Sequence, residues 1–167
     1  ISELYEFLCD DIRTMLDNKQ YEAAFLLSTY LFVKVGNVDM DDSDGGTGMI
    51  SDECQDIWFE ILEESVDERL EQKMFQWFMN SLDGSVIDYM EDYIEETLFV
   101  YFKENKYMEE KLKLTDIMIK LATEKKDDWN SDRLVGYWVK RHLDVLVEMN
   151  VDKSEIDAFC HKYWNVP

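Results

Sequence analysis

The sequence predicts an all-α domain made of antiparallel helical hairpins, arranged as a bundle or a short tetratricopeptide-like solenoid. Apolar residues recur every three or four positions along almost the whole chain. The single proline among 167 residues is Pro167, so proline interrupts none of the expected helices. No stretch alternates convincingly enough to indicate a β-strand. We expect one domain over residues 1–167, and its start at Ile1 instead of Met suggests a piece of a longer chain.

Four helices are expected in the first half of the chain. The first covers 3–16, and the second covers 19–35 and is apolar nearly all round, as in a buried central helix. The third is expected to follow an N-cap at Ser51, and the fourth is expected to begin after Asp67. The inward stripe of the third helix has helical spacing and consists of Cys54, Ile57, Trp58, Ile61 and Leu62.

Four more helices are expected in the second half. The fifth follows the turn at Gly84 and should turn its carboxylates, including Glu91 and Glu95, towards water. The seventh opens at Ser131 and places His142 among core or boundary positions, and the eighth opens with a capping box at Ser154. The sixth covers 105–124, and its expected core stripe is Leu114, Ile117, Met118 and Leu121.

The charge balance limits the partners of this domain. Thirty-eight acidic residues against 17 basic ones give a net charge of −21. Such a domain should repel nucleic acid and anionic membrane surfaces, whereas a basic protein or divalent cations remain allowed. Three cysteines without C-x-x-C spacing indicate neither a disulfide framework nor a zinc ribbon. They fit a reducing, cytoplasmic location.

The loop 39–48 is the one segment that abandons helical patterning. It contains three of the six glycines and four aspartates, Asp39, Asp41, Asp42 and Asp44. Neither glycine register gives the ligand spacing of an EF-hand, although a looser metal site built from these carboxylates stays open. The favoured interpretation is a structural turn in which Asp and Ser side chains bond the loop backbone.

Catalytic and cofactor motifs are missing from the sequence. Di-iron bundles require Glu-x-x-His motifs, and neither histidine lies three residues after a glutamate. The glycines at 45–48 lack the Lys-Ser/Thr of a phosphate-binding loop. We therefore expect no enzyme activity and no cofactor.

Three segments of the chain resemble the helical region that follows the SWIM zinc finger in a set of bacterial proteins of poorly known function. They are 21–24, the Asp-Asp-Ser-Asp-Gly turn at 41–45, and 159–167. The resemblance implies a larger cytoplasmic protein with a zinc finger upstream. The ligand pairs of that finger are absent here, so the resemblance transfers neither zinc nor a nucleic-acid role to this segment.

These observations favour a non-catalytic interaction or scaffolding module whose partner is another protein or the remainder of its own chain. Two alternatives stay open. One is a domain that responds to divalent cations through the loop 39–48, and the other is an acidic mimic of nucleic acid that blocks a basic protein.

Overall fold

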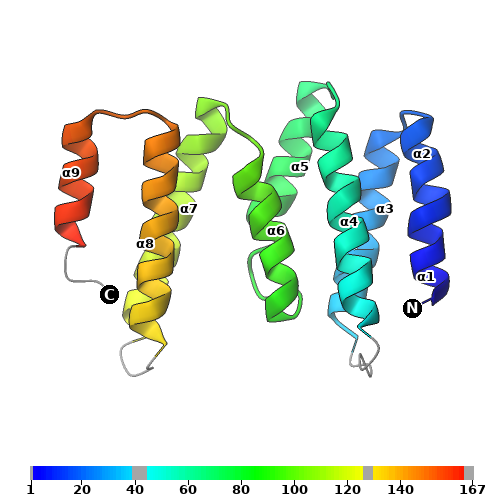
Figure 1. Ribbon diagram of the computed structural model, residues 1–167, viewed down its shortest axis with the longest axis horizontal. Coiled ribbons are helices and arrows are strands. Elements are labelled where there is room, and N and C mark those ends of the chain that lie inside the picture. Colours follow the sequence, from blue (N-terminus) through cyan, green and yellow to red (C-terminus); the bar gives the residue numbers. More distant parts are fainter. Residues whose placement is uncertain (1, 39–44, 126–129, 164–167) are drawn as a thin grey trace. The chain divides into compact units, whose positions relative to one another are not determined.

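A computed structural model describes residues 2–38, 45–125 and 130–163. These residues fold into helices joined by short connections and contain no strand, which confirms the all-α prediction (Figure 1). The elements are α1 (Ser2–Phe7), η1 (Leu8–Ile12), α2 (Arg13–Asp17), α3 (Tyr21–Gly36), α4 (Gly46–Glu63), α5 (Glu68–Asn80), α6 (Asp88–Val100), α7 (Asn105–Glu124), α8 (Ser131–Glu148) and α9 (Lys153–Lys162).

The chain folds as two compact units, 1–101 and 102–167. In the first unit, α1, η1 and α2 form one continuous helix whose middle turn is π-helical. This helix and α6 both pack against α4, while α3 packs against α4 and α5 packs against α6. Figure 1 shows these helices as antiparallel hairpins, with α3 and α5 behind α4 and α6.

The core of the first unit is aromatic. Phe25 of α3 lies edge-on to Trp77 of α5, with ring centroids 5.8 Å apart, and Phe32 lies 5.0 Å from Trp58 of α4. The Trp58 indole nitrogen donates a hydrogen bond to the hydroxyl of Ser28, which is also fully buried. The polar end of the largest buried ring is therefore satisfied inside the core.

In the second unit, α7 and α8 pack as an antiparallel pair. Thr115 near the middle of α7 contacts His142 of α8, whereas Met118 and Ala122 farther along α7 line one groove with Leu134 and Trp138 near the start of α8. Helix α9 covers part of α8 and buries no residue completely. Its attachment depends on half-buried side chains, among them Phe159.

Two expected helix starts are wrong. Helix α4 begins at Gly46, ahead of the expected cap at Ser51, because Gly45 adopts a left-handed conformation with φ of 70°. Ser51 is buried inside this helix and donates its hydroxyl to the carbonyl of Thr47. Helix α9 begins at Lys153, so Ser154 lies inside the helix and does not cap it.

Two expected burial patterns also differ from the structure. Helix α3 is not buried all round, since Leu26 is 46% exposed and Tyr30 is 60% exposed. On α6, Glu95 is buried and does not face water as its spacing suggested. The apolar content of α3 exceeds what its neighbours can cover, and the remainder reaches the surface.

Candidate functional site

The predicted cation ligands Asp39, Asp41, Asp42 and Asp44 lie outside the described residues. Within the described ranges, no group of three or more His, Cys, Asp or Glu side chains is placed to hold a metal ion. The cation-site hypothesis for this loop therefore stays a prediction. What the structure does describe is the exit from the loop, where Gly45 turns the chain into α4.

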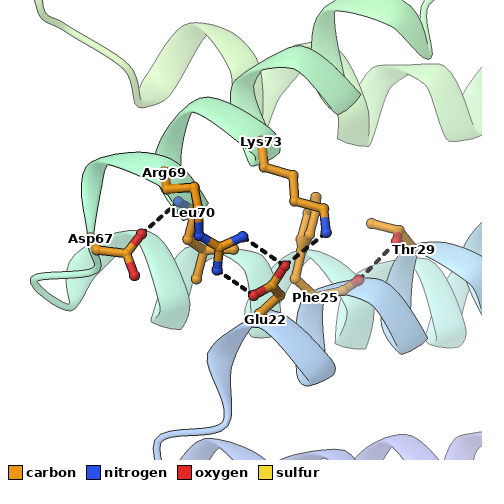
Figure 2. Close-up of polar contacts among 7 residues, drawn as sticks. All are labelled: Glu22, Phe25, Thr29, Asp67, Arg69, Leu70 and Lys73. Atoms are coloured by element: carbon orange, nitrogen blue, oxygen red, sulfur yellow. Dashed lines mark hydrogen bonds and ion pairs between the residues drawn. The ribbon is translucent and has the colours of Figure 1, made fainter.

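A polar cluster joins α3 to α5 (Figure 2) and lies next to a surface hollow. Arg69 donates two hydrogen bonds to the two carboxylate oxygens of Glu22, and Lys73 Nζ lies 2.8 Å from Glu22 Oε1. These two cations lower the pKa of Glu22 to about 2. Asp67 caps the start of α5 by accepting a hydrogen bond from the Leu70 amide.

The hollow beside this cluster has a volume of about 300 Å³ and is lined by residues 19–23, 65–67, 69 and 70. Among its charged residues, Glu22 pairs with Arg69, and Asp67 accepts a hydrogen bond from the Leu70 amide. The ion pair holds α3 and α5 together. We therefore interpret it as a structural clamp.

Helix α7 presents a second apolar face in addition to the one that enters the core. The buried face contains Tyr107, Met108, Lys111, Thr115, Ile119 and Ala122. The stripe expected in the core, at Leu114, Ile117, Met118 and Leu121, is instead turned outwards: Ile117 is 56% exposed, Leu121 is 50% exposed and the other two are half-buried. The prediction that this stripe lies in the core is wrong. Its four residues instead form a partly exposed apolar row with the spacing i, i+3, i+4 and i+7.

We call the outward row of Leu114, Ile117, Met118 and Leu121 the α7 apolar face. A groove adjoins this face. It has a volume of about 340 Å³ and lies between the end of α7 and the start of α8. Most of its lining is apolar, and Glu124 and Lys125 lie at its edge. The lining consists of Met118, Leu121, Ala122, Glu124, Lys125, Leu134 and Trp138. A row of exposed apolar residues beside an apolar groove is typical of a protein-binding surface.

Lys111 and His142 lie in the core of the second unit and have lowered pKa values. Lys111 is fully buried, and burial lowers its pKa to about 7. His142 is 6% exposed, Nδ1 lies 2.8 Å from the Thr115 hydroxyl, and burial lowers its pKa. The ring of His142 stacks on Phe159 with centroids 4.4 Å apart. The prediction of a core histidine is confirmed, whereas no pattern in the sequence singled out Lys111.

The three cysteines are free thiols that differ in burial. Cys54 is fully buried, and burial raises the pKa of its thiol, so it behaves as a small apolar residue. Cys9 and Cys160 are half-buried free thiols in different units.

No protein-family model, curated protein or solved structure matches this chain. Across the residues that the structure describes, no helix is long and apolar enough to cross a membrane.

Proposed function

We propose that this chain is a non-catalytic protein-interaction module and that a partner covers the α7 apolar face. The observation that carries the proposal is the outward row of Leu114, Ile117, Met118 and Leu121, because α7 already buries a different face in its own core. A helix with two apolar faces gains from a second contact, since each fully covered aliphatic side chain contributes about 1.5–3 kcal/mol.

The partner that this surface fits best is an amphipathic helix with basic residues. The groove beside the row extends the apolar surface between two antiparallel helices, where a third helix can insert its own apolar side chains. The net charge of −21 attracts a basic partner over a distance and accelerates its encounter with the domain. The resemblance to the SWIM-associated helical region favours the same scaffolding class of function.

Peptide titration tests this proposal. The probe is a fluorescein-labelled amphipathic peptide of Leu and Lys, about five helical turns long, added to the full chain and followed by fluorescence anisotropy. We expect the wild type to bind and the Ile117→Ser/Leu121→Ser double variant to lose at least about tenfold in affinity, because both side chains are exposed members of the row.

Val147→Ser is the matched control, since Val147 is 57% exposed on α8 and does not line the groove. It should bind the peptide as the wild type does. Equal binding by the wild type and the double variant, or no binding by the wild type, would overturn the proposal.

A further inference from the structure

The connection between α6 and α7 has an unusual backbone. Tyr101 is extended, with φ of −104° and ψ of −174°, and Phe102 follows with φ of 60°. A bulky residue in the left-handed region is strained and persists only where its surroundings hold it. The division between the two compact units falls between these two residues. The chain therefore enters the second unit through a constrained turn.

Contacts from within the second unit hold this turn. The Phe102 side chain is 5% exposed and lies edge-on to Tyr107, with ring centroids 5.5 Å apart. The Phe102 carbonyl accepts a hydrogen bond of 3.0 Å from Nζ of Lys111. The strained residue is thus anchored through both its ring and its backbone.

Lys111 is an unusual residue for this task, because its side chain is fully buried. Lysine is almost never buried completely unless its amine is hydrogen-bonded or paired. Besides the Phe102 carbonyl, the amine lies 3.9 Å from the sulfur of Met108. A charged ammonium at this position loses its hydration, whereas a neutral amine keeps the hydrogen bond at much lower cost.

The charged groups that face Lys111 come from the connection and from α8. Burial is the main cause that lowers its pKa to about 7, and Lys103 and Arg141 lower it further. Glu148 raises the pKa of Lys111, but Glu148 is itself ion-paired with Lys103. The environment as a whole therefore favours the neutral amine.

We propose that Lys111 is a proton-dependent latch on the turn at Phe102, so that proton uptake by its amine favours opening of this turn. In the closed turn the Lys111 amine is buried and bonded to the Phe102 carbonyl, whereas in the open turn the amine is hydrated. The amine of the closed turn therefore binds a proton less tightly than the amine of the open turn. By linkage, the closed turn gains stability as the pH rises from about 7 towards 10.5, and the gain is absent below about pH 7.

Hydrogen exchange of the full chain, read by mass spectrometry on peptides, tests the latch. Rates are corrected for the intrinsic effect of pH, and the reported quantity is the opening constant of residues 101–112. For the wild type we expect this constant to fall by up to about tenfold per pH unit between about pH 7.5 and 9.5. Lys111→Met, which keeps the volume and removes the titrating group, should show no such fall.

A reference peptide from α8, residues 135–146, separates local opening from global unfolding. If Lys111 acts as a latch, the opening constant of residues 101–112 in the wild type must depend more strongly on pH than that of the reference peptide. This comparison uses the wild type alone, so it does not depend on whether a variant folds. A pH-independent opening constant at 101–112, an equal change in both peptides, or an undiminished pH dependence in Lys111→Met would each overturn the proposal.

Discussion

Gly36 shows how one missing side chain positions two helices of the first unit. A Cβ atom at this residue would lie 2.9 Å from Cβ and Cγ1 of Val86 and 3.0 Å from the sulfur of Met90. The end of α3 can therefore approach Val86 and the start of α6 only because residue 36 has no side chain.

We predict that Gly36→Ala destabilises the protein, because overpacking in a filled core costs about 1–3 kcal/mol. Gly48→Ala is the matched control: Gly48 lies in α4, its added Cβ would meet no atom within 4 Å, and alanine favours helix by up to about 1 kcal/mol. Urea unfolding of both variants measures the difference. A Gly36→Ala variant as stable as Gly48→Ala would show that the close approach does not exist.

A second prediction at the residue scale concerns the pH dependence of the stability that Glu22 contributes. Arg69 and Lys73 lower its folded-state pKa to about 2, below the value of an unpaired glutamate. Its contribution to stability is therefore fully present above about pH 4.5 and is lost as the pH falls towards 2. Glu22→Gln should be less stable than the wild type at pH 7, and the difference should shrink between about pH 4.5 and 3.

Urea midpoints at about pH 7, 4 and 3 measure this difference, and Glu109→Gln on the exposed side of α7 serves as the control. A difference between wild type and Glu22→Gln that stays constant over this range would contradict the ion-pair clamp between α3 and α5.

At the scale of elements, the stack of His142 on Phe159 is the best-defined attachment of α9 to α8. Burial lowers the folded-state pKa of His142 below its ordinary 6.5, so the unfolded chain takes up the proton first. Stability therefore falls as the pH drops through and below 6.5. We predict that exchange of the α9 amides, relative to their intrinsic rates, increases from about pH 7 to about pH 5.

His142→Phe keeps an aromatic ring on Phe159 and removes the titration, so its α9 protection should change little over this range. His161→Phe is the control, because His161 is exposed and should leave the pH response intact. The same loss of protection in His142→Phe as in the wild type would contradict a role for His142 protonation.

Helix α7 shows what the sequence can and cannot predict. The sequence predicts its ends at Asn105 and Glu124 correctly, because apolar periodicity defines a helix whichever face is buried. The predicted choice of face is wrong, since two apolar rows lie side by side on this helix and the buried one includes Lys111. Lysine lowers the apolar character of a face, so periodicity favours the purely aliphatic row.

The two wrong helix starts, at Ser51 and Ser154, have a different physical reason. Ser51 and Ser154 are common capping residues, but a serine inside a helix can return its hydroxyl to the preceding turn, as Ser51 does to Thr47. The fourth helix does begin after Asp67, as predicted, and there the Asp67 carboxylate caps the helix by accepting from the Leu70 amide. Residue type alone does not tell whether a polar side chain caps the start of a helix or bonds a carbonyl of the preceding turn inside it.

At the scale of the whole molecule, charge is divided unequally between the two units. Residues 1–101 contain 25 acidic and five basic residues, whereas residues 102–167 contain 13 and 12. Arg13, Arg69 and Lys73 already pair with carboxylates of the first unit, so an excess of acid remains. Nearly all of the −21 net charge therefore belongs to one unit, while the α7 apolar face belongs to the other.

Neutral donors hold several of these acids in place. Tyr93 donates to Asp52, Gln55 to Glu96, and Tyr101 to Glu63, all at exposed positions between α4 and α6. Because these hydrogen bonds do not neutralise the carboxylates, the negative field remains available to attract a basic partner. We therefore expect the association rate, rather than the lifetime of the complex, to fall with added salt.

Site-specific crosslinking reports where a partner lies and so tests whether the α7 apolar face is the binding surface. A photoreactive benzoylphenylalanine is placed at Ile117 in one variant and at Val147 in another, and each is irradiated with the Leu/Lys peptide. We expect crosslinks to the peptide from position 117 and few or none from position 147. Equal crosslinking from both positions, or none from position 117, would contradict the assignment of the α7 apolar face as the binding surface.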